Sequence, residues 1–180
     1  MGKTIERRIS YWTRNFNYVM KDKIKSIFII NFILISSDFI SKILIKSLTI
    51  PFFSFKVIDG FFNIVYVRNK GIAFGLLKTL DGNLRNFFLI YIPLAIIIVV
   101  FFYILYSKKI TKLTFWGLNL IIAGAIGNLI DRYFYGYVVD FLDFYYKNFH
   151  WPAFNFADFY ISIGTILLII DSFVSKKKGD

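Results

Sequence analysis

The sequence contains no cysteine and only one histidine. Without cysteine the chain can form no disulfide, no thiolate nucleophile and no cysteine-ligated metal or iron–sulfur site. A zinc site would need carboxylates for nearly all of its protein ligands, and a serine–histidine hydrolase would have to use His150, which has no G-x-S-x-G partner. We therefore expect neither a metal nor a cofactor.

Charged residues are also scarce, at 18% of the 180 residues, whereas hydrophobic residues make up 57% and aromatic residues 21%. Such a composition is too apolar for an ordinary soluble domain and predicts an integral membrane protein. The formal net charge of +11 fits anionic lipid and topology signals better than nucleic acid, so we expect no nucleic-acid partner. Spanning segments leave little room for a second domain, and residues 1–180 are expected to form one.

Four apolar runs have the length of about 20 residues that a helix needs to cross a bilayer. They cover about residues 26–48, 87–106, 113–130 and 157–174. Barrel strands would be about half as long. The predicted fold is therefore a membrane bundle of four transmembrane helices.

Lysine and arginine are concentrated before the first run, between the second and third, and after the fourth. The positive-inside rule makes these three segments cytoplasmic, together with both termini. Residues 1–25 place apolar side chains at spacings of three and four, which predicts an amphipathic extension on the cytoplasmic leaflet.

The segment 49–85 lies on the outer side in this topology and is rich in β-branched and aromatic residues. Asp59-Gly60 joins two such runs, which predicts a β-hairpin with a type I′ turn. We expect a small extracytoplasmic sheet resting on the outer leaflet, with His150 as a further interfacial residue.

Two aspartates flank one short outer loop, between the third and fourth spans. Asp140 sits among apolar residues, where an ionised carboxylate loses hydration. Asp158 follows Asn155 by three residues, so both could simply form a capping box. If the two carboxyls share a site, however, one keeps a proton, and the pair supplies the acid and the base of an aspartic protease. Asp143, three residues after Asp140, is the nearest rival and would share its side of a helix.

Other polar residues near the spans call for a partner or a function. Asp38 and Lys42 are four apart and suit an ion pair, whereas Asn69 to Gly75 contains two glycines and suits a tight turn. One helical face combines three further residues that could brace the site: Asn128, Asp131 and Arg132.

Two functions other than proteolysis stay open on these residues. A small transporter could use Asp and Lys within the spans, and would lose flux rather than peptide cleavage on mutation of Asp140. A non-enzymatic membrane assembly factor would tolerate Asp140→Asn or Asp158→Asn as long as it folded.

Five stretches in this order resemble the lipoprotein signal peptidase family, also called signal peptidase II. They are Asp38-Phe-Ile-Ser-Lys42, Asn69-Lys-Gly-Ile-Ala-Phe-Gly75, Gly127-Asn-Leu-Ile-Asp-Arg132, Val139-Asp-Phe141 and Phe154-Asn-Phe-Ala-Asp158. The resemblance implies that Asp140 and Asp158 are the catalytic aspartates. It assigns a supporting shell to Asp38, Lys42, Asn69, Gly75, Asn128, Asp131, Arg132 and Asn155.

The same resemblance implies four helices, a periplasmic β-cradle and a short helix over the site. It implies an enzyme of the bacterial cytoplasmic (inner) membrane with its active site near the outer face. Its substrates would be prolipoproteins whose future N-terminal cysteine carries diacylglycerol, cut just before that cysteine, and globomycin would inhibit it.

Overall fold

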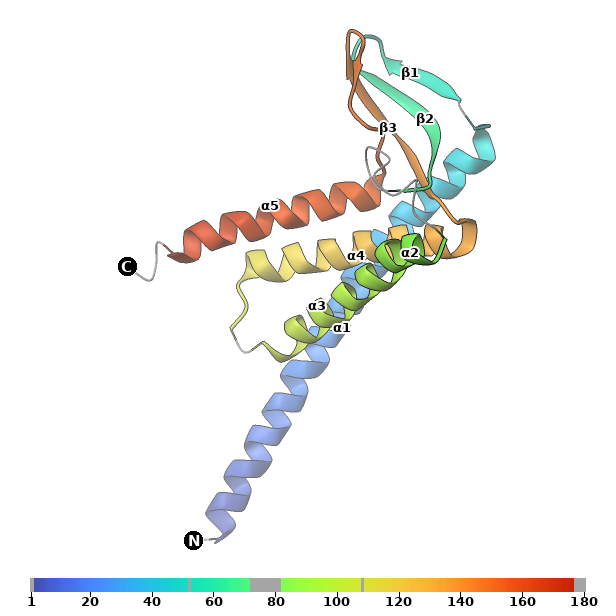
Figure 1. The fold of residues 1–180 in the computed structure, drawn as a ribbon. Coiled ribbons are helices and arrows are strands. Elements are labelled where there is room, and N and C mark those ends of the chain that lie inside the picture. The colour runs from blue at the N-terminus through green and yellow to red at the C-terminus, as the bar shows by residue number, and fades with distance from the viewer. Residues whose placement is uncertain (1, 52, 72–81, 108, 177–180) are drawn as a thin grey trace.

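The described part of the chain contains four helices that are long and apolar enough to cross a membrane, as predicted (Figure 1). The computed structural model describes residues 2–51, 53–71, 82–107 and 109–176, with side chains described from residue 20 to 175 within these ranges. The helices are α1 (Gly2–Leu48), α2 (Gly82–Asn86), the π-helical turn η2 (Phe87–Tyr91), α3 (Ile92–Tyr106), α4 (Lys112–Tyr135) and α5 (Phe156–Lys176).

Helix α1 has 47 residues and runs without a break through both the predicted extension and the first span. Its span begins at Met20, and the second span runs from Gly82 through η2 to Tyr106. The short helix implied by the resemblance has no separate counterpart in the described residues, where α2 continues into η2 and α3. The placement of residues 1–25 on the cytoplasmic leaflet stays a prediction.

In the described residues, a four-stranded antiparallel sheet stands beyond one end of the helix bundle (Figure 1). Its strands, in the order β1-β2-β3-β4, are Ser54–Ile58, Phe62–Asn69, Val138–Tyr146 and Phe149–His150. The β1–β2 hairpin was predicted, but its type I′ turn was wrong. Gly60 has a φ of +77°, whereas Asp59 is not among the described residues with positive φ, so only one of the two central residues is left-handed.

Strand β3 corrects the prediction of a short outer loop between the third and fourth spans. Residues Val138–Tyr146 pair with β2, so the second half of the sheet comes from a segment about 75 residues further along the chain. Gly136, with a φ of +71°, ends α4 by donating its N–H to Arg132 O at 3.0 Å and turns the chain into β3. This turn fixes where the strand that carries Asp140 begins.

Helix α4 is the centre of the bundle and packs against α1, α3 and α5. Its closest partner is α5, because glycines face each other across that interface: a Cβ at Gly164 would lie 2.5 Å from Gly117 O, and one at Gly117 would lie 2.8 Å from Gly164 O. Small residues at such positions let two membrane helices approach closely. The α4–α5 contact places Asp158 beside the C-terminal half of α4, where Asn128 contacts it.

Gly164→Ala is therefore expected to destabilise the protein by about 1–3 kcal/mol, because the added methyl meets backbone that cannot move aside. Thermal unfolding in detergent micelles measures the effect as a lower melting temperature. Gly82→Ala is the matched control, since a Cβ there meets nothing within 4 Å. An unchanged melting temperature for Gly164→Ala would show that α4 and α5 are not packed this closely.

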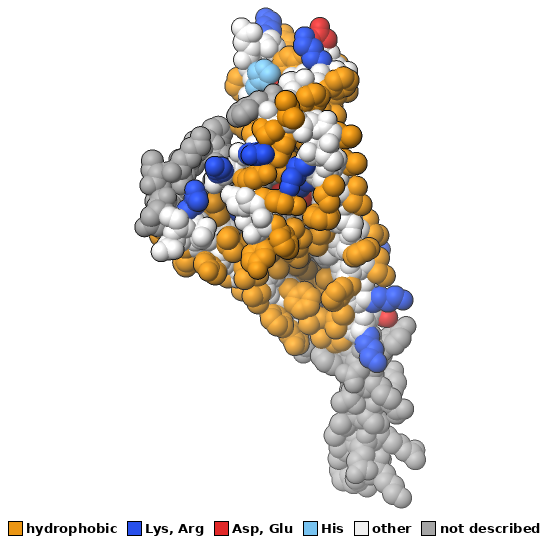
Figure 2. All heavy atoms as spheres, turned by 90° about the vertical axis from the view of Figure 1, so that its right-hand side faces the viewer, with side chains coloured by type: hydrophobic (Ala, Val, Ile, Leu, Met, Phe, Trp, Pro, Cys, Tyr) orange, Lys and Arg blue, Asp and Glu red, His pale blue; other side chains and the backbone are white. Residues whose placement is uncertain are grey.

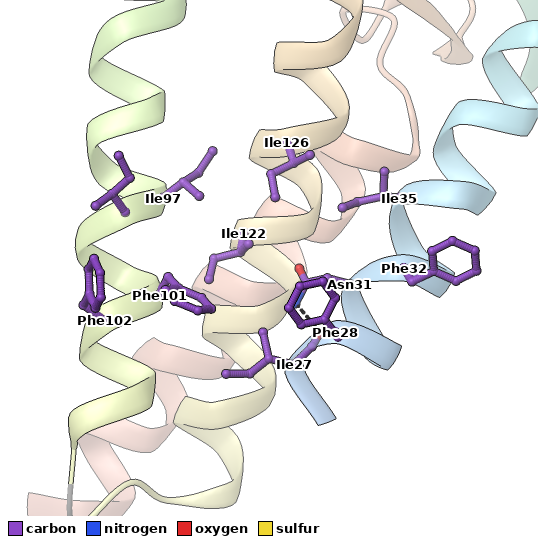
Figure 3. A pocket seen from close by; sticks show the side chains of 11 residues that line it. Ile27, Phe28, Asn31, Phe32, Ile35, Ile97, Phe101, Phe102, Ile122 and Ile126 are labelled. Atoms are coloured by element: carbon purple, nitrogen blue, oxygen red, sulfur yellow. Dashed lines mark hydrogen bonds between the residues drawn. The ribbon is translucent and has the colours of Figure 1, made fainter. Parts of the chain in front are cut away.

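The outer surface of the helices is apolar. Figure 2 shows hydrophobic side chains over the helices, between two levels at which Lys and Arg side chains gather. Phe32 and Phe173 are more than 70% exposed, as expected for side chains that face lipid. A groove of about 360 Å³ between α1, α3 and α4 carries Asn31 as the one polar side chain of its lining (Figure 3). Asn31 Nδ2 donates to Asn119 Oδ1 at 2.8 Å and so joins α1 to α4.

Candidate active site

Asp158 lies in the first turn of α5, where a reciprocal capping box holds it. Asn155 Oδ1 accepts from Asp158 N–H at 2.9 Å, and Asp158 Oδ2 accepts from Asn155 N–H at 3.3 Å. Ala157 N–H donates to Asp38 Oδ1 at 2.9 Å, so a carboxylate from α1 satisfies another donor of this helix end. The helix N-terminus favours negative charge at Asp158.

Asp140 lies on β3 and is buried. The start of its strand is anchored by Val139 N–H, which donates to Asp131 Oδ2 at 3.0 Å. Asp140 Oδ2 accepts from Asn69 Nδ2 on the neighbouring strand β2 at 3.0 Å, and Oδ1 accepts from Asn155 Nδ2 at 2.7 Å. Both oxygens of the carboxyl are thus held by amide donors.

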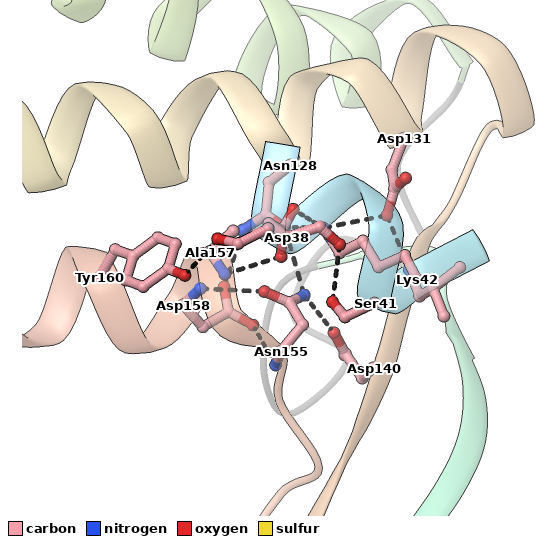
Figure 4. Close-up of polar contacts among 12 residues, drawn as sticks. Asp38, Ser41, Lys42, Asn128, Asp131, Asp140, Asn155, Ala157, Asp158 and Tyr160 are labelled. Carbon is pink, nitrogen blue, oxygen red and sulfur yellow. Dashed lines mark hydrogen bonds and ion pairs between the residues drawn. The ribbon is translucent and has the colours of Figure 1, made fainter. Parts of the chain in front are cut away.

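Asn155 contacts both aspartates, so the capping box is also the link between them (Figure 4). Asn128 completes this network: its Nδ2 donates to Asp158 Oδ1 at 2.7 Å, and its Oδ1 accepts from Asn155 Nδ2 at 3.2 Å. The capping role and the pairing of the two aspartates are therefore compatible, and the same side chains serve both.

Burial and the neighbouring charge of Asp158 raise the pKa of Asp140 to about 7, although hydrogen bonds from Asn69 and Asn155 act in the opposite direction. A substantial fraction of Asp140 therefore still holds its proton near neutral pH. A carboxyl that keeps its proton to such a pH can act as an acid beside a second carboxylate.

Lys42 ties the supports of both aspartates together (Figure 4). Its Nζ lies 2.7 Å from Asp38 Oδ2 and 3.1 Å from Asp131 Oδ2, and it donates to Asn128 Oδ1 at 3.2 Å. The predicted Asp38–Lys42 ion pair is thus present. Through Asp38 it reaches the start of α5, and through Asp131 it reaches the start of β3. One buried cation therefore connects the two elements that carry Asp158 and Asp140.

A cleft of about 540 Å³ opens beside the two aspartates. Asn69 and Arg132 line it together with them, so four polar side chains are gathered at this part of the cleft. Its other walls are largely apolar and come from α5 and from residues 151–154. The cleft can hold an extended chain with one polar bond next to the carboxyls.

Proteins of one known family are similar to this chain in sequence and in fold. A family model described as signal peptidase (SPase) II matches residues 30–174. The chain belongs to the signal peptidase II family. The lipoprotein signal peptidase of Clostridium tetani is 48% identical over 124 residues, covering 68% of this chain and 75% of that one. The lipoprotein signal peptidase of Maridesulfovibrio salexigens is 37% identical over 148 residues, covering 82% and 95%.

The match to the lipoprotein signal peptidase of Cupriavidus necator is 49% identical over 115 residues, and it spans 63% of this chain and 64% of that relative. A solved structure of a bacterial membrane enzyme superposes with a TM-score of 0.76 at 31% identity, covering 87% of this chain and 93% of that one. The predicted family, fold and enzyme class, an aspartic endopeptidase that processes prolipoproteins, are thereby confirmed.

The predicted supporting residues of this signal peptidase fall into three groups. Asp38, Lys42 and Asp131 form the buried ion cluster, while Asn69, Asn128 and Asn155 donate to the two aspartates. Arg132 lines the cleft. Gly75 lies outside the described residues. The catalytic and supporting roles of these residues stay predictions.

The rival carboxylate, Asp143, is held elsewhere. Because β3 is a strand, residues three apart point to opposite faces, so the expectation that Asp143 shares the side of Asp140 was wrong. Asp143 accepts from Asn63 Nδ2 at 2.9 Å, and its Oδ1 lies 2.9 Å from His150 Nδ1. Its partners therefore lie within the sheet, and it does not line the cleft.

Sequence reasoning missed the apolar wall of the cleft. Trp151, Pro152, Ala153 and Phe154 line it from the loop before α5, and Phe159, Ser162 and Ile163 line it from α5 itself. The spacing of 159, 162 and 163 marks one face of a helix that begins at the catalytic end, which is the signal that could have identified them.

Proposed function

We propose that Asp140 and Asp158 cut the signal peptide from diacylglyceryl-modified prolipoproteins, just before the lipidated cysteine. The observation that carries the proposal is the contact of Asn155 with both carboxyls, which line one cleft. Asp158, stabilised as an anion by Asn128 and the helix N-terminus, accepts a proton from water. Neutral Asp140 donates a hydrogen bond to the peptide carbonyl, which makes its carbon more electrophilic.

A lipid anchor favours this reaction because it holds the scissile bond at a fixed depth in the membrane. Asp140 lies beyond the end of α4, and Asp158 lies at the start of α5, so both sit at one boundary of the spans. A substrate whose cysteine is anchored in the outer leaflet presents its preceding peptide bond at this level. Globomycin would inhibit by occupying the same cleft.

The direct test uses purified protein in lipid vesicles with two forms of one prolipoprotein, diacylglyceryl-modified and unmodified. Mass spectrometry of the products should show a cut before the lipidated cysteine, no cut in the unmodified form, and loss of cutting with globomycin. Cleavage of both forms at equal rates, or at another bond, would contradict the proposed substrate.

The pH dependence follows from the proton on Asp140. Its pKa of about 7 means that the acid form is present below that pH and is lost as the pH rises through it. We expect kcat/KM to fall on the alkaline side with an apparent pKa near that value. Asn69→Ala removes a hydrogen bond that favours the charged form, so it should move this limb to higher pH.

Asn63→Ala is the control for this shift, because Asn63 lies on the same strand but donates to Asp143. Its pH profile should match that of the wild type. An alkaline limb that stays in place in Asn69→Ala would show that another group controls it.

We also propose that both termini are cytoplasmic and that the chain forms one membrane-embedded unit in the bacterial inner membrane, with residues 1–25 as a cytoplasmic extension. Because the sequence has no cysteine, single cysteines report topology without background labelling. In intact cells stripped of their outer membrane, a membrane-impermeant maleimide should label Asn148→Cys. It should label Ser175→Cys only after permeabilisation, and the reverse pattern would invert the topology.

A further inference from the structure

Two cations and three tyrosines gather on the face of the sheet that is turned away from the cleft. We call this set the reverse-face cluster: Lys46, Tyr66, Arg68, Tyr135 and Tyr137. Along β2 the side chains alternate, so Asn69 points to Asp140 whereas Arg68, one residue before it, points to the opposite face. The cluster is therefore separate from the catalytic cleft although it shares a strand with it.

The contacts within the cluster bring both cations to the tyrosines. Lys46 Nζ lies 3.0 Å from the centre of the Tyr135 ring, and the Arg68 guanidinium lies 5.1 Å from the centre of the Tyr137 ring. Arg68 Nε also donates to Tyr66 Oη at 3.4 Å, and the hydroxyls of Tyr66 and Tyr137 are 3.3 Å apart.

The buried Tyr66 hydroxyl experiences both positive charges. Burial acts to raise the pKa of Tyr66, but hydrogen bonds with Tyr137 and Arg68 and the charges of Arg68 and Lys46 outweigh it and lower that pKa. The ion pairs found among the described side chains give neither Lys46 nor Arg68 a carboxylate partner. Positive charge thus converges on Tyr66, and no ion pair among the described side chains neutralises it.

The cluster lies at the ends of two spanning helices, α1 and α4, and therefore at the boundary of the membrane. Lys46 lies two residues before the end of α1, Tyr135 is the last residue of α4, and the exposed Tyr133 and Phe134 stand beside it. Phosphodiester groups of a bilayer lie at this boundary, and tyrosine is favoured there.

We propose that the reverse-face cluster binds the phosphate of an anionic phospholipid of the outer leaflet. Lys46 and Arg68 pair with the charged oxygens, the tyrosine hydroxyls donate to them, and Tyr133 and Phe134 contact the acyl chains. The occupant is a lipid rather than free phosphate because the cluster opens beside lipid-facing aromatic side chains. A bound lipid would also contact β2 on the face opposite the cleft, next to Asn69, which donates to Asp140.

The test compares full-length wild type with Lys46→Gln, Arg68→Gln and the double variant, all stripped of lipid in detergent. Each is incubated with phosphatidylglycerol, with phosphatidylcholine or with inorganic phosphate, and retained ligand is measured by native mass spectrometry. Lys147→Gln is the matched control, because Lys147 also lies over a tyrosine ring, at 5.5 Å from that of Tyr146, on the outer sheet.

Wild type should retain phosphatidylglycerol in preference to phosphatidylcholine and to phosphate. Each single variant should weaken that binding by about fivefold and the double variant by about 25-fold, whereas Lys147→Gln and Arg68→Lys should bind like wild type. Equal losses in Lys147→Gln, equal retention of the two lipids, or full binding by the double variant would overturn the proposal. Retention of inorganic phosphate at the affinity of the lipid would overturn the choice of occupant.

Discussion

Asp158→Asn and Asp140→Asn are each expected to lower the rate of prolipoprotein cleavage by about 10³- to 10⁴-fold. Asparagine keeps the size of the side chain but can neither take a proton from water as Asp158 does nor carry the acidic proton of Asp140. The cleavage rate is measured with purified variants in vesicles, on a diacylglyceryl-modified substrate. The two losses should not add in the double variant, because the carboxyls act as one unit.

Asp143→Asn is the control that tells chemistry from folding. It removes a carboxylate from the same strand, but its partners are Asn63 and His150 of the outer sheet, so cleavage should change only a few fold. Folding of all variants is checked by thermal unfolding in detergent. If a folded Asp140→Asn or Asp158→Asn variant still cuts, that residue is not part of the mechanism. If only Asp143→Asn loses activity, the catalytic carboxyl is Asp143.

The four spans and the capping box of Asn155 and Asp158 were predictable from the sequence because each depends on neighbouring residues. The length of each apolar run is enough to predict a membrane span. The spacing of three residues between Asn155 and Asp158 is enough to predict a capping box. The pairing of Asp140 with Asp158 was expected from a short loop between them, whereas strand β3 and the contacts of Asn155 bring them together. The sequence alone could not show that Asn155 bonds to both.

Strand β3 and the ion cluster were harder to predict from the sequence, because their partners are distant along the chain. Residues 138–146 form a strand only because β2 pairs with them, and reading that segment as loop or helix put Asp143 on the wrong face. Lys42 could be paired with Asp38 four residues away, but its contact with Asp131 depends on the packing of α1 against α4.

Lys42→Met is the second change with a large expected effect, on stability as well as on activity. The Asp38 and Asp131 side chains are 1% and 2% exposed, so removal of their shared cation leaves two like charges buried together. Breaking a buried ion pair from one side costs about 3–5 kcal/mol. The variant should unfold at a markedly lower temperature in detergent and should lose cleavage, because the starts of α5 and β3 lose their common anchor.

Lys25→Met removes an exposed lysine from the same helix and should leave both measurements unchanged. Asp38→Asn added to Lys42→Met should recover part of the lost stability, because it removes one of the unpaired charges, but not the cleavage. If stability is recovered while cleavage is not, Lys42 does more than stabilise the fold: it also positions α5 and β3, which carry the two aspartates. If Lys42→Met alone unfolds like wild type, the charge cluster is not a buried ion pair, and the placement of Asp140 and Asp158 must depend on the asparagine network instead.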